Sequence, residues 1–407
     1  MFDSIRFYCL IIALLIYAGF SSPTPDAPAF IEGVIGALLC FAAIPGALKL
    51  AYRFNAQAPI PALYSCGLIA LLYALSIPLF TGVIANMPMT DIMRDVIAVC
   101  FLFMPLFYLD LLHDNAARQK RLLITACIMG TLFALRTLAQ DPSTFLAHNF
   151  VPFLHTGTNE LTYLANAPTL FLTAALGYYV AINRFNLRTV TAPHQALTML
   201  ILLGGSVACV AAMSITLQRA SLALLAITCL YAHLHTAKTA PIKSSLIFIA
   251  VIAALLSISS FASPVLNTIT ALNEKTIQHG ANMRAEEWQA VIDALQCAPF
   301  GAIIGLGWGS GLFSPATSGA YVTFTHGLIS ASLLKTGLLG LIIIGGYLTS
   351  IVWPLIQKFR RAPIMVMALC APIAIDVTLY GAYKSLDFGV ILLLAASMHH
   401  NISGENS

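Results

Sequence analysis

The stretch Tyr321–Leu348, YVTFTHGLISASLLKTGLLGLIIIGGYL, decides the class of fold. Beyond His326 it is long enough for a helix that crosses a bilayer, which needs about 20 apolar residues, and Lys335 is its only charged side chain. The same bias extends over all 407 residues, of which 59% are hydrophobic and 9% are charged. Soluble domains contain about 25% charged residues, so the composition predicts a polytopic membrane protein.

Apolar segments of similar length recur along the chain and predict an all-α integral membrane protein with about 12 transmembrane helices in a single transmembrane domain, residues 1–407. The expected spans are 6–21, 28–47, 60–84, 91–112, 121–139, 160–183, 196–214, 219–235, 243–262, 326–353, 363–381 and 386–400.

The distribution of basic residues predicts the orientation of these spans. With the N-terminus in the cytoplasm, 13 of the 20 lysines and arginines fall on the cytoplasmic side, in agreement with the positive-inside rule. They are Arg6, Lys49, Arg53, Arg118, Lys120, Arg121, Arg184, Arg188, Lys238, Lys243, Lys358, Arg360 and Arg361. Both termini are then cytoplasmic, and residues 262–325, between spans 9 and 10, form one large loop on the opposite side.

Seven basic residues remain on the outer side or inside a span, where insertion disfavours cations: Arg94, Arg136, Arg219, Lys275, Arg284, Lys335 and Lys384. Arg94 can pair with Asp91 three residues before it, the alternative being contact with a ligand. Lys384 is expected to form a surface pair with Asp387. Arg136 has no acidic neighbour one helical turn away.

The large loop contains a predicted amphipathic helix in NMRAEEWQAVIDALQCAPF, residues 282–300. Its apolar face is expected to consist of Trp288, Val291, Ile292 and Leu295. Arg284 shares that face, and the acidic residues, among them Glu287, are expected to point elsewhere. We favour an anionic ligand for Arg284 over the alternative, in which it extends to a lipid phosphate.

Two further polar residues stand at the beginnings of predicted spans. Arg219 begins the span 219–235, where the helix dipole and the free N–H groups favour an anion. His326 begins the tenth span, and Lys335 follows nine residues later on the opposite face of a regular helix. We therefore expect Lys335 to have either a structural partner or a broken helix around it.

Three segments in this order resemble the O-antigen ligase and polymerase superfamily of bacterial envelope glycosyltransferases: LQRASLALLAI, NMRAEEWQAVIDALQCAPFGAIIGLGWG and THGLISASLLKTGLLGL. The matching positions are Arg219, Arg284, Trp288, Pro299, Gly305, Gly307, His326, Leu334, Gly337 and Gly340, with Asn159 in TGTNELTYLANA as a further match. Two features depart from the family: Gly327 stands where Asn is common, and the loop is shorter than in many polymerases. The short loop favours the ligase branch.

The resemblance implies a reaction that joins O-antigen polysaccharide from undecaprenyl pyrophosphate to lipid A–core oligosaccharide, at the periplasmic face of the bacterial inner membrane. His326 would be the catalytic base, in keeping with an ordinary imidazole pKa near 6.5, or alternatively a phosphate ligand. Arg219, Arg284 and Arg136 would bind the pyrophosphate. Asn159, Trp288, Lys335 and Arg94 are further candidates for contact with substrate.

We expect an inverting reaction without metal or other cofactor, because the first outer loop has only Asp26 as an acid and the other outer acids lack ligand spacing. The net charge of +4 is too small to suggest a nucleic-acid partner. Two alternatives stay open. One is an O-antigen or exopolysaccharide polymerase; the other is a flippase or transporter of lipid-linked glycans, in which internal repeats would be expected.

Overall fold

The computed structural model describes residues 2–21, 30–55, 61–113, 115–140, 164–184, 193–238, 241–242, 245–246, 248–249, 284–315 and 319–398. The first half of the chain forms α1 (Phe2–Phe20), α2 (Phe30–Asn55), α3 (Ala62–Ala74), α4 (Ile77–Ile84), α5 (Met89–Leu102), α6 (Met104–Leu112) and α7 (Ala116–Gln140). The second half forms α10 (Pro168–Arg184), α11 (Pro193–Ile215), α12 (Arg219–Ala237), α15 (Arg284–Gln296), α16 (Gly301–Ile304), β1 (Leu312–Ser314), β2 (Ala320–Val322), α17 (Leu328–Gln357), α18 (Pro363–Thr378), η4 (Gly381–Lys384) and α19 (Leu386–Ser397).

The prediction of an all-α membrane protein is confirmed by seven helices in the described residues that are long and apolar enough to cross a membrane. They are Phe2–Phe20, Phe30–Tyr52, Ala62–Ile84, Met89–Leu112, Ala116–Gln140, Arg219–Ala237 and Leu328–Gln357, and each overlaps one expected span. Two of them restart midway, as α4 and α6, where Pro78 and Pro105 stand in the first turn of the new helix. Proline has no N–H and cannot continue the preceding helix, so these positions are natural points for a restart.

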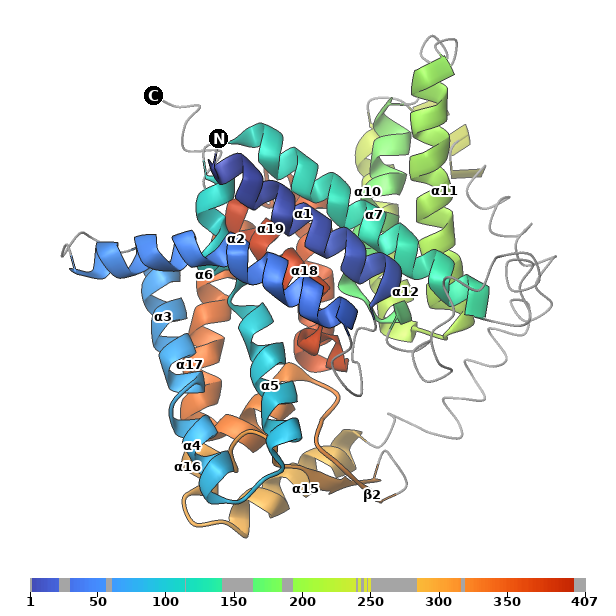
Figure 1. Cartoon of the computed structure of the whole chain (residues 1–407). Helices are drawn as coiled ribbons and strands as arrows, with labels where there is room; N and C mark the ends of the chain where they lie inside the picture. Colours follow the sequence, from blue (N-terminus) through green and yellow to red (C-terminus); the bar gives the residue numbers. More distant parts are fainter. Residues whose placement is uncertain are drawn as a thin grey trace.

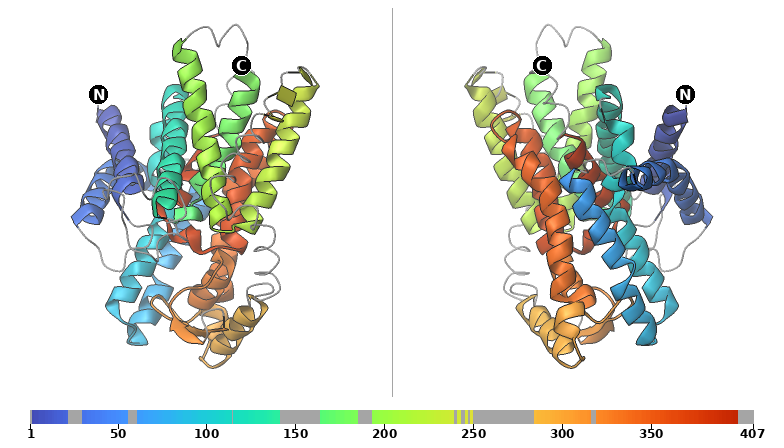
Figure 2. Two further views of the ribbon diagram at one scale, coloured as in Figure 1. Left: turned by 90° about the vertical axis from the view of Figure 1, so that its right-hand side faces the viewer. Right: turned by 90° about the vertical axis from the view of Figure 1, so that its left-hand side faces the viewer.

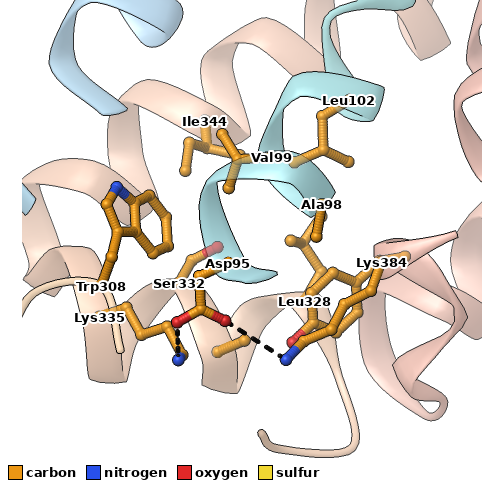
Figure 3. Close-up of a pocket in the computed structure, with 12 residues that line it drawn as sticks. Asp95, Ala98, Val99, Leu102, Trp308, Leu328, Ser332, Lys335, Ile344 and Lys384 are labelled. Atoms are coloured by element: carbon orange, nitrogen blue, oxygen red, sulfur yellow. Dashed lines mark hydrogen bonds and ion pairs between the residues drawn. The ribbon is translucent and has the colours of Figure 1, made fainter. Parts of the chain in front are cut away.

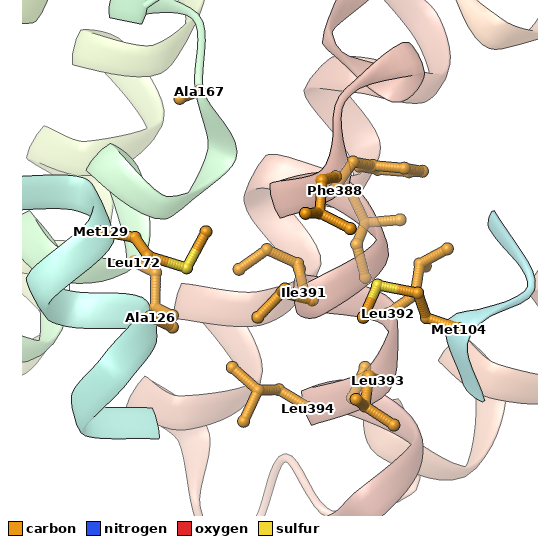
Figure 4. Packing of buried hydrophobic residues seen from close by; sticks show 14 of the residues in the cluster. Met104, Ala126, Met129, Ala167, Leu172, Phe388, Ile391, Leu392, Leu393 and Leu394 are labelled. Atoms are coloured by element: carbon orange, nitrogen blue, oxygen red, sulfur yellow. The ribbon is translucent and has the colours of Figure 1, made fainter. Parts of the chain in front are cut away.

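The expected span 386–400 corresponds to α19, which has 12 residues. At 1.5 Å per residue it covers about 18 Å, less than the roughly 30 Å of a bilayer core. Every residue of α19 is buried, and Figure 4 shows Phe388, Ile391 and Leu392 among side chains of α6, α7 and α10. The last helix is therefore a core helix on which the others pack. Of the expected span 243–262, only four residues lie in the described part of the chain.

Several of the basic residues assigned to the cytoplasmic side lie in, or donate hydrogen bonds to, the first two turns of α1. Arg6 is completely buried and pairs with Asp110 at 3.0 Å, Arg118 donates to Ser4 Oγ, and Arg121 donates to the Tyr8 hydroxyl. The start of α1 lies at one end of the molecule and α15 lies at the other, as Figures 1 and 2 show. The basic cluster and the helix α15 of the large loop thus lie at opposite ends of the bundle.

The long helix α17 is broken at Gly337, which has φ = +67°. The carbonyls of the three residues before the break accept hydrogen bonds from other parts of the chain. Leu306 N–H donates to Leu334 O at 2.9 Å, Gly307 N–H donates to Lys335 O at 3.0 Å, and the Tyr73 hydroxyl donates to Thr336 O at 2.8 Å. The break therefore lets the loop Gly305–Gly309 lie directly against the helix backbone, and Lys335 is placed immediately before it.

The described part of the large loop forms an outer layer made of α15, α16 and the antiparallel hairpin β1–β2. Its core consists of Val291, Leu295, Leu312 and Leu334. The predicted helix is present, and Val291 and Leu295 of its predicted apolar face are buried, but the other two positions of that face are not. Glu287 is buried, whereas Trp288 is 37% exposed and Ile292 is 39% exposed. Positions 284, 287, 291 and 295 turn inward because they follow one helical stripe toward β1 and α17.

A Gly337→Ala substitution should destabilise the protein by at least about 2 kcal/mol. The backbone has positive φ, and a Cβ atom would overlap the carbonyl of Ile303. The measurement is the thermal unfolding midpoint of the purified full chain in detergent. Gly345→Ala in the same helix is the matched control, because a Cβ there meets nothing within 4 Å. Equal midpoints for both variants would show that the break is not required.

Candidate functional site

His326 is held by Glu287, although the two residues come from different segments of the outer layer. The backbone N–H of His326 donates to Glu287 Oε1 at 2.9 Å, and the ring atom Nδ1 lies 2.6 Å from Oε2. An ionised carboxylate only accepts, so Nδ1 carries the proton and Nε2 of the neutral ring keeps its lone pair. The His326 side chain is 37% exposed, and Nε2 has no hydrogen-bond partner among the described residues. The pair fixes both the orientation and the tautomer of the imidazole.

The electrostatics of Glu287 favour its ionised form. Its side chain is 5% exposed, and burial alone would raise its pKa. The hydrogen bonds and charge of His326, together with the charge of Arg284, outweigh burial and lower the pKa of Glu287 below its usual value. Glu287 therefore stabilises a positive charge on His326, which is what a general base acquires when it accepts a proton.

The turn that carries His326 is fixed by small polar residues. Thr325 is completely buried, and the Ser330 hydroxyl donates to its hydroxyl at 2.9 Å. Gly327 is the N-cap of α17, and a Cβ atom at this position would lie 3.0 Å from the carbonyl oxygen of Thr378. The close approach of α18 explains why glycine, rather than a larger residue, stands after this histidine.

Arg284 lies near this pair and stacks on an aromatic ring. Its guanidinium carbon is 5.7 Å from the centre of the Tyr380 ring. Tyr380 is the N-cap residue of η4. Burial is the largest cause that lowers the pKa of Arg284, and the charge of Arg219 acts in the same direction. Its Nη1 atom is buried and has no hydrogen-bond partner among the described residues. A buried N–H of a cation without an acceptor is costly, so this atom favours an anionic ligand.

Arg219 begins α12, as predicted, and faces the same region. The chain turns into this helix through Leu217, whose φ is +56°. The charge of Arg219 acts on both Arg284 and Tyr380, and Tyr380 is also held to α12 through the backbone of Ala220. Arg219, Arg284 and His326 are therefore brought together by Tyr380 and Glu287.

A second charged cluster lies in the adjacent part of the molecule and includes Lys335. Its ammonium group pairs with Asp95 of α5 and donates to Ser310 O at 3.1 Å. Figure 3 shows Asp95 between Lys335 and Lys384; Lys384 lies 3.5 Å from the other carboxylate oxygen. Both of the explanations offered for Lys335 therefore apply, since it has a structural partner and directly precedes a broken helix. The predicted pair of Lys384 with Asp387 is wrong, because Asp387 is buried against Thr169.

The remaining sequence candidates have different surroundings. Arg136 is completely buried and donates to the carbonyls of Ala18 and Ser21 at 3.0 and 2.9 Å, so it caps the end of α1. Arg94 is 49% exposed and lies 3.8 Å from Asp91, as expected from their spacing. Trp288 is on the more exposed side of α15. Asn159 lies outside the described residues.

Sequence reasoning missed Glu287, Tyr380 and Asp95. A signal for Glu287 was present, since it is three residues after Arg284 and four before Val291 and thus belongs to one helical stripe with them. Tyr380 and Asp95 had no such signal, because their contacts join segments far apart in the chain.

Among the described residues, no group of three or more His, Cys, Asp or Glu side chains is placed so that it could hold a metal ion. No protein-family model matches the chain, and no curated protein sequence matches it. The chemistry is therefore argued from the site. The Nε2 atom of a partly exposed imidazole next to a buried carboxylate can accept a proton, and two arginines near this pair can bind phosphate oxygens.

Replacing Glu287 by Gln should lower the free energy of unfolding at pH 7 by about 1–3 kcal/mol, because a buried charged partner of His326 is lost. The folded-state pKa of Glu287 is lowered, so its stabilising contribution is present above its unfolded pKa of about 4.3 and is lost as the pH falls through the folded value. The measurement is the unfolding midpoint of both proteins between pH 7 and pH 3. Their difference should shrink below about pH 4.

Glu286→Gln is the matched control, because Glu286 is the exposed neighbour of Glu287 on the same helix. It should leave the unfolding midpoint at pH 7 unchanged. A Glu287→Gln midpoint that equals that of the control at pH 7 would contradict the pairing with His326.

Proposed function

We propose that the chain is a membrane glycosyltransferase that uses a lipid-linked glycosyl pyrophosphate as donor. More specifically, we propose an O-antigen ligase, which transfers O-antigen polysaccharide from undecaprenyl pyrophosphate to lipid A–core oligosaccharide. The class is supported by one observation above the others: the oriented His326–Glu287 pair lies close to Arg284, whose buried Nη1 lacks an acceptor. The choice of the ligase rests on the resemblance of the three sequence segments and on the short loop.

In the proposed reaction, a hydroxyl group of the acceptor sugar attacks the anomeric carbon of the donor. His326 Nε2 accepts the hydroxyl proton while the new C–O bond forms, and Glu287 stabilises the resulting imidazolium. The bond from the anomeric carbon to the pyrophosphate oxygen breaks, and the lipid pyrophosphate leaves with the electron pair. Direct displacement inverts the anomeric carbon, and no metal or cofactor is required in this proposal.

Arg284 and Arg219 would bind the pyrophosphate oxygens through charge-assisted hydrogen bonds, each worth about 1.5–3 kcal/mol. Such bonds accelerate the reaction only if they strengthen while negative charge develops on the leaving group. The stacking of Arg284 on Tyr380 limits the orientations available to its guanidinium. An arginine prepared in this way loses less conformational entropy when a phosphate binds.

The proposal includes a topology of about 12 membrane segments, the last of which is the short buried helix α19. Both termini would lie in the cytoplasm and the site at the periplasmic face of a bacterial inner membrane. Its support is the separation of the basic cluster around the start of α1 from the outer layer that contains α15.

His326→Ala should lower the rate of glycan transfer by about 10²–10⁴-fold, the usual contribution of a general base. Arg284→Ala should lower kcat/KM by about 10–150-fold, as expected for one lost charge-assisted bond. The measurement is transfer by the purified full chain to rough lipopolysaccharide from an undecaprenyl-pyrophosphate-linked donor. Arg121→Ala at the opposite end of the bundle is the control and should remain active. Unchanged transfer by correctly inserted His326→Ala protein would contradict the role of the base.

The acceptor distinguishes the proposed ligase from a polymerase. The wild-type chain is given the same donor with either rough lipopolysaccharide or a second lipid-linked glycan. We expect one glycan to be joined to lipopolysaccharide, without growth of the lipid-linked chain. Growth of the lipid-linked glycan would identify a polymerase instead, and movement of the donor across vesicles without any transfer would identify a flippase or transporter.

A further inference from the structure

The cluster of Asp95, Lys335 and Lys384 contains one more positive charge than negative charge. Asp95 Oδ2 pairs with Lys335 and accepts the backbone N–H of Gly309 at 2.8 Å. Its Oδ1 atom lies 3.5 Å from the Lys384 ammonium. The next acid along α5, Asp91, is paired with Arg94. The single carboxylate of Asp95 is thus shared between two lysines. It neutralises the charge of Lys384 less completely than that of Lys335, because Lys384 is the more distant of the two.

The side chain of Lys384 is more exposed than that of Lys335. The Lys335 side chain is 2% exposed, whereas that of Lys384 is 19% exposed. Burial is the largest cause that lowers the pKa of Lys384 to about 8, Asp95 opposes this change, and the like charge of Lys335 adds to it. The carboxylate therefore does not fully offset the cost of burying this ammonium group.

Lys384 also lies next to the candidate site. Its ammonium is 5.9 Å from the centre of the Phe324 ring, and the Phe324 ring is 6.1 Å from that of His326 in an edge-to-face arrangement. Lys384 is in η4, whose N-cap residue is the Tyr380 that stacks on Arg284. One short element thus joins a partly exposed cation to the aromatic ring that holds Arg284.

The cluster borders a small cavity with an apolar wall formed by residues that include Val99, Leu102 and Ile344 (Figure 3). Its volume of about 20 Å³ is sufficient for one water molecule. A phosphate group is larger than this, so an anion would bind at the exposed edge of Lys384 instead of inside the cavity.

We propose that Lys384 is a further anion-binding residue, which binds a phosphate group of a lipid substrate beside the Arg219–Arg284 site. The ammonium can turn from Asp95 to the phosphate, because Asp95 then remains neutralised by Lys335. The phosphate belongs either to the isoprenoid pyrophosphate donor or to a phosphorylated lipid acceptor. This inference rests on the proposed function, since it assumes that a lipid phosphate reaches the site.

The first test measures binding of three probes to the full chain: undecaprenyl pyrophosphate, diphosphorylated lipid A, and undecaprenol as a lipid without phosphate. Lys384→Gln should weaken binding of at least one phosphorylated probe by about tenfold or more, and Lys384→Arg should restore most of it. Binding of undecaprenol should not change. Lys49→Gln is the matched control, because Lys49 is an exposed lysine paired with Asp110 far from this site.

The second test uses the wild-type protein and so does not depend on the folding of a variant. Acetic anhydride modifies neutral amines, and mass spectrometry reports the acetylation of Lys384 with and without each probe. A phosphorylated probe that binds Lys384 should slow its acetylation severalfold, whereas undecaprenol should not.

Protection and weaker binding with undecaprenyl pyrophosphate assign the phosphate to the donor, and the same results with lipid A assign it to the acceptor. If neither probe protects Lys384, and Lys384→Gln binds both as wild type does, the inference is wrong. The transfer assay on the same wild-type preparation separates the two proposals. Active protein without protection contradicts only the inference, and protection without transfer contradicts only the glycosyltransferase.

Discussion

The break of α17 at Gly337 is the constraint on which the site depends. An unbroken helix would use the carbonyls of residues 334 to 336 in its own ladder. Here the amides of the loop after α16 and the Tyr73 hydroxyl satisfy them. The outer layer is thereby joined to the membrane part through backbone hydrogen bonds, and α15 can pack beside the first turn of α17. Without that contact, Glu287 would not reach His326.

Two polar side chains that carry the site's interactions stand at either end of the first segment of α17: His326 just before the helix and Lys335 just before its break. The two residues are nine positions apart, and each contacts a carboxylate from another element, Glu287 or Asp95. His326 is held by hydrogen bonds to Glu287, whereas Lys335 and Asp95 form a pair of charges. Two charges 4 Å apart gain about 4 kcal/mol at an effective dielectric constant of 20, and desolvation opposes this gain. Such pairs therefore stabilise the fold only while both partners are present. Each makes the position of α17 depend on a segment distant in the sequence.

The sequence predicted the class of fold well, because hydropathy acts on one segment at a time. All seven bilayer-length helices overlap expected spans, and α15 lies within the segment 282–300 in which a helix was predicted. The buried side of α15 was predicted only in part: Val291 and Leu295 are buried as expected, whereas Trp288 and Ile292 are exposed and Glu287 is buried. That face is instead set by β1 and α17, which the helix contacts. Burial of Glu287 becomes understandable only when its partner, His326, is known.

Contacts between distant segments also explain why a cation on the predicted outer side does not by itself indicate a ligand site. A membrane disfavours each such cation, but a neighbouring segment can satisfy it equally well. Arg136 donates from one guanidinium nitrogen to two carbonyls at the end of α1, Arg94 pairs with Asp91, and Lys335 pairs with Asp95. Arg284 differs in its surroundings, because its buried Nη1, which has no acceptor within the described part of the chain, lies close to the His326–Glu287 pair. The informative property is therefore not the presence of a charge at the membrane surface but the groups around it, and at Arg284 an unmade hydrogen bond lies beside the oriented imidazole of His326.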